Sequence, residues 1–331
     1  MNIENLIRLT GGSKHSKPSV SSITDYAFDP YKVKPGDAYM ALDRSQASID
    51  IAVARGAYAI FFDRPVLIGD PEIAWIEVEN VEMAMVRLMR FESSYRKLQY
   101  VAITLLQETI LENLRLPFNV HILSQNLTEV FQCIMHASEG SFLFCSNTTL
   151  LQKIAPIHES IWTEHQAVAM EGSTLFQSSF VHQGIYYRNL PLAPLFIPAF
   201  SGVLTFLQEK ALMYRVEPFK PLSHFEPLFV DRAMGVHPFG STRQALIIES
   251  SEELFEYEAK ILKRTLPNKS LLIGRPKKST LQNDVDFIYD TEADLKKLDA
   301  SQFRYALILG DKQKIETALN AERPYQQLSL F

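Results

Sequence analysis

The alternation of apolar and polar residues is clearest in residues 23–63, which predict the order strand, tight turn, strand, helix, strand. The turn falls at residues 34–37. Pro35 fixes the φ angle that the second position of a turn requires, Gly36 can adopt a positive φ, and Asp37 can hydrogen-bond to the turn backbone. Aromatic and branched residues on either side favour strands, because such side chains pack well on a pleated sheet.

After the second strand the pattern changes to helical spacing. Apolar residues recur at this spacing in residues 49–55, Gly56 follows where a left-handed cap is expected, and residues 58–62 form a continuous apolar strand. In the rest of the chain, segments with strand-like alternation of apolar residues follow segments with helical spacing. It predicts helices at 1–12, 81–95, 127–137, 147–154, 199–213, 252–266, 292–298 and 312–319, and strand-like segments at 73–78, 98–104, 118–123, 142–145, 168–187, 245–249, 270–273, 287–289 and 306–309.

Strands that alternate with helices predict mostly parallel sheets joined by right-handed crossovers, so the predicted fold class is α/β. A chain of 331 residues has room for two or three domains. We expect three consecutive α/β domains, at residues 1–97, 98–220 and 221–331. The last of them is Rossmann-like and ends in a tail at residues 322–331.

Composition limits the classes of function. The formal net charge is −5, which argues against direct binding of nucleic acid or of an anionic membrane through a basic surface. Cys133 and Cys145 are the only cysteines, and no Cys/His spacing is typical of a zinc site, so we expect no metal centre. The amino terminus lacks the profile of a signal peptide, and no apolar run reaches membrane-spanning length. We therefore expect a cytoplasmic protein.

The amino-terminal stretch resembles the first domain of the Mur ligases, above all of the member that adds D-alanyl-D-alanine to UDP-N-acetylmuramoyl-tripeptide. The resemblance rests on Val-Lys-Pro-Gly-Asp at 33–37, the aromatic Tyr39, Ala-Leu at 41–42 and Arg-Gly-Ala-Tyr-Ala-Ile at 55–60. It implies a trimmed bacterial Mur ligase of three α/β domains, with a role in peptidoglycan biosynthesis. In this family the first domain holds the UDP end of the substrate.

The phosphate-binding loop of the family has no counterpart. In a Mur ligase the strand at 98–104 would lead into Gly-Thr-Asn-Gly-Lys-Thr, whereas residues 105–109 here are Leu-Leu-Gln-Glu-Thr. Such a loop needs glycines to wrap its backbone around phosphates and a lysine to reach the terminal ones, yet Glu108 lies about where the lysine belongs. The family's magnesium ligands also find no match. The sequence therefore predicts no ATP-dependent ligation, no catalytic residues and no ATP or magnesium cofactor.

The resemblance implies five candidate residues for the UDP end of a substrate: Asp29, Lys32, Lys34, Gly36 and Asp37. Asp29 matches the aspartate of the family's Asp-Ser-Arg motif, but the serine and arginine that follow it there are absent here. Lys32 or Lys34 could replace that arginine as point charges, although arginine is better suited to bidentate contact with a diphosphate. Alternatively, these residues simply shape a turn.

The carboxyl terminus, Gln327-Leu-Ser-Leu-Phe331, resembles the pentapeptide with which bacterial proteins bind the DNA sliding clamp. Gln327 would supply a hydrogen-bonding amide, Leu330 and Phe331 would fill an apolar pocket, and a terminal position would leave the tail accessible. Alternatively, Leu328 and Phe331 pack on the last domain.

Three hypotheses follow from these features. The first is a pseudoenzyme of peptidoglycan precursor metabolism that binds UDP-N-acetylmuramoyl-peptide or another UDP-sugar precursor without ligating it. The second is an active ATP-dependent amide ligase with a rebuilt nucleotide site. The third is a protein that associates with the sliding clamp through Gln327, Leu328, Leu330 and Phe331.

Overall fold

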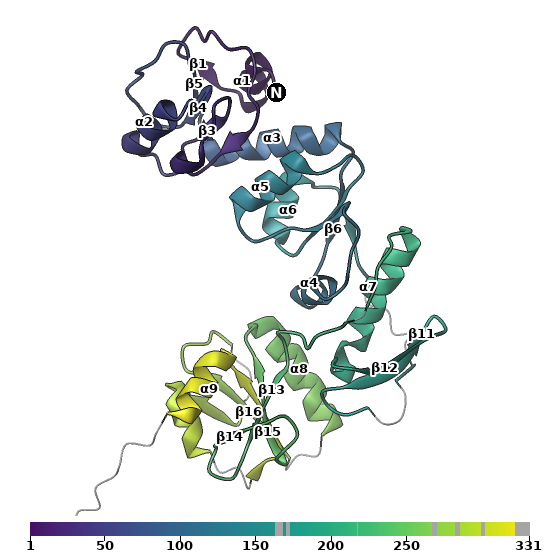
Figure 1. Cartoon of the computed structure of the whole chain (residues 1–331). Helices are drawn as coiled ribbons and strands as arrows, with labels where there is room; N and C mark the ends of the chain where they lie inside the picture. The colour runs from purple at the N-terminus through teal and green to yellow at the C-terminus, as the bar shows by residue number, and fades with distance from the viewer. Residues whose placement is uncertain are drawn as a thin grey trace, which may run out of the picture. The chain divides into compact units, whose positions relative to one another are not determined.

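The computed structural model describes residues 1–162, 173–216, 218–266, 270–281, 285–298 and 302–321, together with the backbone of 168–169. The chain divides into two compact units, each of which contains two sheets (Figure 1). The amino-terminal unit comprises Met1–Thr104 and Leu116–Ile161. The carboxy-terminal unit comprises Leu105–Arg115 and Trp162–Phe331.

The first sheet has the strand order β1-β5-β4-β3-β2. Strands β2 to β5 run parallel, and only β1 is antiparallel to its neighbour. One face packs on α1 and α3 and the other on α2, so the central strands are buried on both faces. The elements are α1 Ile3–Thr10, β1 Ser13–Lys14, β2 Tyr26–Ala27, η1 Pro30–Lys32, β3 Ala38–Met40, α2 Gln46–Ala54, β4 Ala59–Phe62, β5 Ala74–Glu77 and α3 Val81–Tyr95.

The second sheet of the amino-terminal unit is parallel and has the order β7-β8-β6-β9. Helix α3 joins it to the first sheet, because α3 packs against α1 and also against α5 and α6. One apolar cluster therefore contains residues from both sheets. The elements are β6 Gln99–Ala102, β7 Val120–Ile122, α5 Leu127–His136, β8 Phe142–Cys145, α6 Thr148–Ile154 and β9 Glu159–Ser160.

The carboxy-terminal unit begins with α4, which packs against α7. Beside α7 lies a three-stranded antiparallel sheet in which β11 and β12 form a hairpin. Gln183 and Gly184 turn this hairpin with φ angles of 46° and 78°, and two positive values favour the tight turn that matches strand twist. The elements are α4 Leu105–Glu112, β10 Val168–Ala169, β11 Ser178–His182, β12 Ile185–Leu190, η2 Pro194–Phe196 and α7 Ile197–Glu209.

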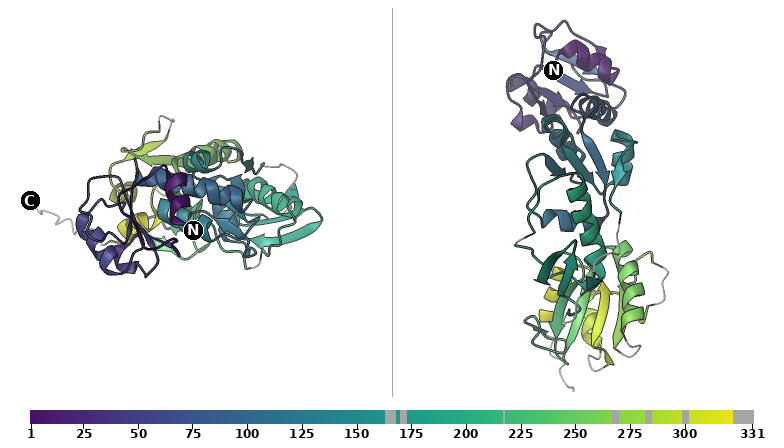
Figure 2. Two further views of the ribbon diagram at one scale, coloured as in Figure 1. Left: turned by 90° about the horizontal axis from the view of Figure 1, so that it is seen from above. Right: turned by 90° about the vertical axis from the view of Figure 1, so that its right-hand side faces the viewer.

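The last sheet has the order β14-β13-β15-β18-β16-β17, with β15, β18, β16 and β17 parallel and β13 and β14 antiparallel. Helices α8 and α9 lie on opposite faces (Figure 2), which makes this a Rossmann-like layer structure. The elements are β13 Glu226–Val230, β14 Val236–His237, β15 Gln244–Glu249, α8 Glu252–Thr265, β16 Leu271–Pro276, β17 Phe287–Tyr289, η3 Glu292–Lys297, β18 Tyr305–Leu309 and α9 Lys312–Asn320.

The α/β class and the order of most elements are confirmed, and two details of the prediction are wrong. The turn at 34–37 lies between β2 and β3, which pair in parallel through a connection that also contains η1. Residues 105–112 form an unpredicted helix, α4. The predicted helix 199–213 begins at 197 and ends at 209, since Ala211 adopts a left-handed φ of 53°.

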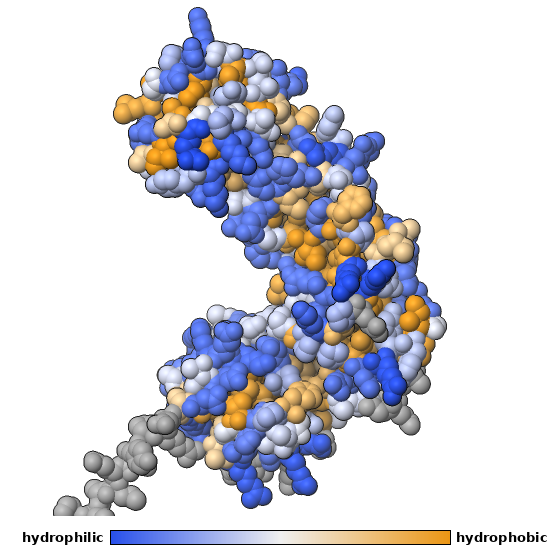
Figure 3. All heavy atoms as spheres, viewed as in Figure 1, coloured by the Kyte–Doolittle hydropathy of each residue, from blue (hydrophilic) through white to orange (hydrophobic). Residues whose placement is uncertain are grey.

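Polar and charged residues cover most of the face shown in Figure 3, with apolar patches between them. Several large apolar side chains in the described part of the chain are exposed, among them Phe118 and Trp162. None of the helices formed by described residues is long and apolar enough to cross a bilayer. The boundaries predicted at residues 97 and 220 stay predictions.

Candidate functional site

Asp29 and Lys32 lie in the loop that leaves the carboxyl edge of the first sheet. Asp29 follows β2 and caps η1, where its Oδ1 accepts a hydrogen bond from the backbone N–H of Tyr31 at 3.0 Å. The Lys32 side chain is 83% exposed and its Nζ lies 3.9 Å from Oδ2 of Asp29. In open parallel sheets, ligands bind outside the carboxyl ends of the strands, so both side chains are placed where a ligand could meet them.

Lys34, Gly36 and Asp37 lie at the opposite edge, because they immediately precede β3. The Asp37 carboxylate is buried and accepts a hydrogen bond from the N–H of Lys34 at 2.9 Å, and the Asp37 N–H donates to the Lys34 carbonyl at 3.1 Å. Gly36 has a φ of 99°. These contacts account for Gly36 and Asp37 as turn-forming residues, so the structure does not bring the five candidate residues to one edge.

We expect Gly36→Ala to destabilise the amino-terminal unit by about 2–4 kcal/mol, since the left-handed backbone and a steric clash both oppose a side chain there. A Cβ at this position would lie 2.3 Å from Oγ1 of Thr24. Urea unfolding followed by Trp75 fluorescence measures the change. Gly140→Ala is the matched control, because Gly140 has a φ of 73° with open space around it. Equal losses in the two variants would contradict a steric role for Thr24.

Arg44 is a residue at the carboxyl edge that the sequence pattern did not single out. It follows β3 with a φ of 56°, which is uncommon for a residue other than glycine. Its Nε and Nη2 each donate to one carboxylate oxygen of Asp63 at 3.0 Å, and the Asp63 side chain is only 4% exposed. The guanidinium is 40% exposed. Arginine at a strand's carboxyl end was the available signal, but its pairing with Asp63 required the fold.

At the position of the phosphate-binding loop, β6 leads almost directly into α4. Leu106, Gln107, Ile110 and Leu111 of this helix are buried, and α4 packs against α7. Only residues 103–104 separate strand from helix, which is too few to wrap a chain of phosphates with backbone N–H groups. Three of these four buried side chains are apolar, whereas a nucleotide-binding ligase needs a polar loop at this position.

The charge on α4 is also unfavourable for a polyphosphate. Burial, and next the Glu108 carboxylate one turn away, raise the pKa of Glu112. A raised carboxyl pKa indicates a locally negative and partly desolvated environment, the opposite of a phosphate site lined by lysine or arginine.

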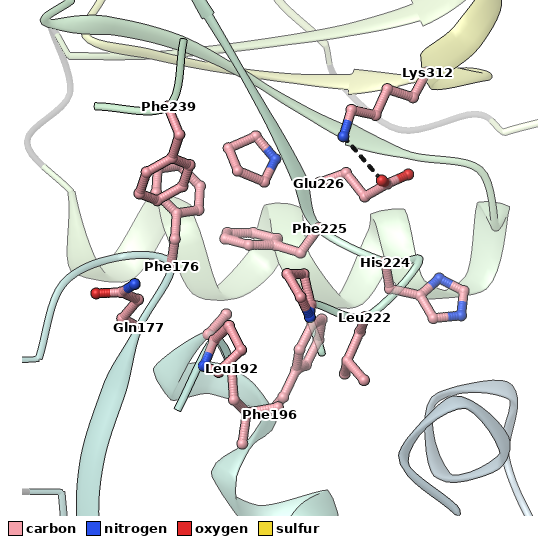
Figure 4. Close-up of a pocket in the computed structure, with 14 residues that line it drawn as sticks. Phe176, Gln177, Leu192, Phe196, Leu222, His224, Phe225, Glu226, Phe239 and Lys312 are labelled. Atoms are coloured by element: carbon pink, nitrogen blue, oxygen red, sulfur yellow. Dashed lines mark hydrogen bonds and ion pairs between the residues drawn. The ribbon is translucent and has the colours of Figure 1, made fainter. Parts of the chain in front are cut away.

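The carboxy-terminal unit contains a cavity of about 370 Å³ beside β13 (Figure 4). Its size lies within the range of small ligand-binding pockets. Aromatic and proline side chains form most of its wall, and the rings of Phe176 and Phe225 lie 6.0 Å apart. The lining residues are Phe176, Gln177, Pro191, Leu192, Ala193, Phe196, Pro221, Leu222, His224, Phe225, Glu226, Pro227, Phe239 and Lys312. We call it the aromatic–proline cavity.

The charged side of this cavity is an ion pair that joins β13, a strand of the antiparallel part of the last sheet, to α9. Nζ of Lys312, the first residue of α9, lies 3.0 Å from Oε1 of Glu226 on β13 (Figure 4). Each side chain is about one-third exposed, at 32% and 30%, so solvent reaches the pair. The cavity thus combines an apolar interior with one charged pair.

Behind the cavity wall lies a buried carboxylate. Glu249, at the end of β15, is fully buried; its Oε1 lies 2.9 Å from Nδ1 of His224 and accepts a hydrogen bond from the N–H of Ser251 at 2.7 Å. Its Oε2 accepts one from the N–H of Phe225 at 3.2 Å. Phe225 has a left-handed φ of 54°, so this carboxylate holds a strained residue of the cavity wall in place.

Glu258 of α8 is also fully buried. Burial, and next the neighbouring Glu249 carboxylate, hold its pKa well above the ordinary value. Two buried carboxyl groups side by side cannot both ionise at low cost, so the raised pKa of Glu258 favours its neutral form.

Among the described residues no cluster of three or more His, Cys, Asp or Glu side chains could hold a metal ion. The predicted partner-binding residues Gln327, Leu328, Leu330 and Phe331 lie outside the described residues.

No protein-family model and no curated protein matches this sequence. Solved structures do match over most of the chain. MurF from Acinetobacter baumannii, in its crystal structure I, matches with a TM-score of 0.58 at 13% identity, covering 96% of this chain and 97% of that one. UDP-N-acetylmuramoylalanyl-D-glutamyl-2,6-diaminopimelate–D-alanyl-D-alanyl ligase from the same organism matches with a TM-score of 0.54 at 12% identity, again covering 96% and 97%.

MurF ligase from Thermotoga maritima, whose structure was solved in complex with ADP, matches with a TM-score of 0.54 at 12% identity. This match covers 89% of the present chain and 97% of that chain. At such low identity the likeness shows a shared fold. The chain therefore has the multi-domain α/β fold of the Mur ligases.

Proposed function

We propose, from the fold that this chain shares with Mur ligases, that it binds a UDP-linked peptidoglycan precursor without ligating it. The ligand would meet the carboxyl edge of the first sheet, beside Asp29, Lys32 and Arg44. The protein would then hold or sense the precursor, whereas a ligase would consume it.

The observation that carries this proposal is the direct passage from β6 to α4. The first sheet is covered on both faces, whereas the segment after β6 is a helix with buried Leu106, Ile110 and Leu111. Ligation by phosphoryl transfer depends on positioning and neutralising the transferred phosphate. A helix with acidic Glu108 and Glu112 supplies neither function.

The names of the structural neighbours support the substrate class. The Acinetobacter baumannii neighbour is named as a ligase of a UDP-N-acetylmuramoyl peptide, and the Thermotoga maritima neighbour was solved with ADP. We infer that the present chain retains the first of these ligand classes and has lost the second.

Calorimetric titration of the purified chain with UDP-N-acetylmuramoyl-tripeptide tests the proposal. We expect micromolar binding, which corresponds to about 8 kcal/mol, and the same affinity with or without ATP and magnesium. A parallel assay measures phosphate release in the presence of the precursor, ATP, magnesium and D-alanyl-D-alanine. Release that depends on D-alanyl-D-alanine would establish the alternative, an active ligase with a rebuilt nucleotide site, and would overturn the proposal.

We expect Lys32→Ala to weaken precursor binding about tenfold, because it removes a charge-assisted contact worth about 1.5 kcal/mol or more. The side chain is 83% exposed, so stability should be unchanged. Lys97→Ala is the matched control: Lys97 is 74% exposed in the same unit and pairs with Glu139 at 2.6 Å. Equal affinities for Lys32→Ala, Lys97→Ala and the unmodified chain would show that Lys32 does not contact the precursor.

A further inference from the structure

We propose that the outer edge of β12 binds an extended acidic segment of a partner protein, which adds to the sheet as a further strand. The hairpin of β11 and β12 lies in the carboxy-terminal unit (Figure 1), and the inference does not rest on precursor binding. In the strand order β10-β11-β12, no other strand among the described residues pairs with the outer side of β12. Such an edge is a template for pairing with another chain.

The backbone of β12 directs hydrogen-bonding groups to this edge. The two-residue turn at 183–184 makes residues 182 and 185, which pair across it, a hydrogen-bonded pair. From there along β12, the N–H and C=O groups of every second residue point toward β11, and those of the residues between them point outward. The outward groups belong to Tyr186 and Arg188, which therefore offer two donors and two acceptors to a strand that lies alongside.

The side chains of β12 lie on two faces of the sheet. Tyr187 is buried and its ring lies 5.5 Å from the ring of Phe200 of α7, so this face is covered. Tyr186 and Arg188 lie on the opposite face, because successive side chains of a strand alternate. Both are exposed, Tyr186 at 53%. A partner strand would place two of its own side chains, two residues apart, opposite Tyr186 and Arg188.

A groove of about 560 Å³ lies beside this edge. Besides Tyr186 and Arg188, its lining residues are Ile185, Tyr187, Leu190, Arg215 and Val216. Ile185 is 49% exposed. Charged side chains alone are enough to protect a strand edge from pairing. The exposed apolar surface of Ile185 and Tyr186 next to the arginines therefore favours a binding surface over a merely protected edge.

The charge of the groove favours an acidic partner. Arg188 and Arg215 line it, and Arg115 is next to Arg215, because the backbones of these two residues exchange hydrogen bonds of 2.9 and 3.1 Å. None of the three arginines forms an ion pair with a described residue. An acidic residue opposite Arg188 and a branched or aromatic residue opposite Tyr186 are favourable cross-strand pairs. A second copy of the same edge would bring like charges together.

Fluorescence anisotropy with labelled peptides and the full-length chain tests the proposal. The probe is the peptide Thr-Glu-Thr-Val-Thr-Glu-Thr, whose palindromic order places an acidic residue two positions from valine in either strand direction. We expect saturable binding with a dissociation constant on the order of 100 μM. The same peptide with lysine in place of both glutamates should bind about tenfold more weakly, because it places like charges opposite the arginines.

Two N-methylated forms of the probe distinguish strand addition from charge attraction alone. In each form methyl groups block alternate backbone N–H groups, and the two forms are offset by one residue. Only one of these sets of N–H groups can face β12. We therefore expect one form to bind about tenfold more weakly than the unmodified probe and the other to bind within about threefold of it. Equal affinities of the two forms would overturn strand addition.

The variant Arg188→Glu, made in the full-length chain, locates the binding site. We expect it to weaken binding of the acidic probe about tenfold and to strengthen binding of the lysine peptide about tenfold, because the cross-strand charge pair changes sign. Misfolding could not produce the second effect. Arg243→Glu, at an exposed arginine elsewhere in the same unit, is the matched control and should change neither affinity.

Three further results would overturn the proposal. The first is the absence of saturable binding of the acidic probe up to about 1 mM. The second is unchanged affinity for both peptides in Arg188→Glu, which would exclude β12 as the binding site. The third is a dimer in sedimentation velocity that the acidic probe dissociates, which would assign this edge to a second copy of the chain.

Discussion

Replacing Phe131 by alanine is expected to lower the free energy of unfolding of the amino-terminal unit by about 3–5 kcal/mol, the usual cost of removing a buried phenylalanine. Phe131 of α5 has no exposed surface. Its ring meets Tyr26 edge-on at 4.9 Å and Phe28 at 5.4 Å. The same face of α5 donates a hydrogen bond from Gln132 to the carbonyl of Tyr26 at 2.7 Å. Phe131 therefore couples the second sheet's helix layer to the first sheet.

Trp75 provides the measurement, because it lies in β5 of the first sheet and is buried. If both sheets of the unit unfold together, Phe131→Ala shifts the urea midpoint seen by Trp75 fluorescence as much as the midpoint seen by circular dichroism. A Trp75 transition that stays in place would show that the first sheet unfolds independently. Phe91→Ala is the control: Phe91 is 38% exposed on α3, and we expect a loss below about 1 kcal/mol.

Replacing Glu249 by alanine is expected to destabilise the carboxy-terminal unit by about 3–5 kcal/mol, the cost of leaving three buried hydrogen-bonding groups without their acceptor. The substitution would leave His224 and the backbone N–H groups of Phe225 and Ser251 without their acceptor. It would also release Phe225 from its left-handed conformation in the cavity wall. Urea unfolding followed by circular dichroism measures the loss. Glu253→Ala, at an exposed position of the same helix start, is the control and should change little.

Glu258 should behave in the opposite way to Glu249. Burial first, and then Glu249, raise the pKa of Glu258 in the folded state, which favours the neutral form, so Glu258→Gln should cost less than about 1 kcal/mol. A raised folded-state pKa contributes stability that is fully present below the unfolded pKa and is lost as the pH rises toward the folded pKa. Between the unfolded-state and folded-state pKa values of Glu258, the free energy of unfolding of the unmodified chain should therefore fall by up to about 1.4 kcal/mol per pH unit because of this group.

Comparison of the two pH profiles isolates this effect. The stability of Glu258→Gln relative to the unmodified chain should increase from pH 5 upward, because glutamine has no proton to lose. Parallel profiles for the two chains would contradict a raised pKa of Glu258 in the folded protein.

Local chemistry was sufficient to predict the turn at 34–37. Pro35, Gly36 and Asp37 act at a distance of one or two residues, and the structure shows the expected φ of 99° at Gly36 and the hydrogen bond from Lys34 to the Asp37 carboxylate. The direction in which β2 and β3 pair could not be read in the same way. Turn residues fix the backbone only locally, and the connection from Phe28 to Asp37 contains η1 as well as the turn.

The resemblance to Mur ligases likewise predicted the fold, and the structural neighbours confirm it. The division at residues 97 and 220, precursor binding and the role of the tail remain predictions. The helix α4, at residues 105–112, was not predicted. Its apolar spacing, with Leu106, Ile110 and Leu111 buried, is the helical signal that was present.

The sequence by itself determined the α/β order, the turn and the absence of the glycines and lysine of a phosphate-binding loop at residues 105–109, because all of these are properties of neighbouring residues. Only the tertiary structure decided three further features: the pairing of Arg44 with Asp63, the contact of His224 with the buried Glu249, and the cavity beside β13. Each brings together residues from separate segments. These side chains interact only after folding brings their segments into contact and burial fixes the distances between them.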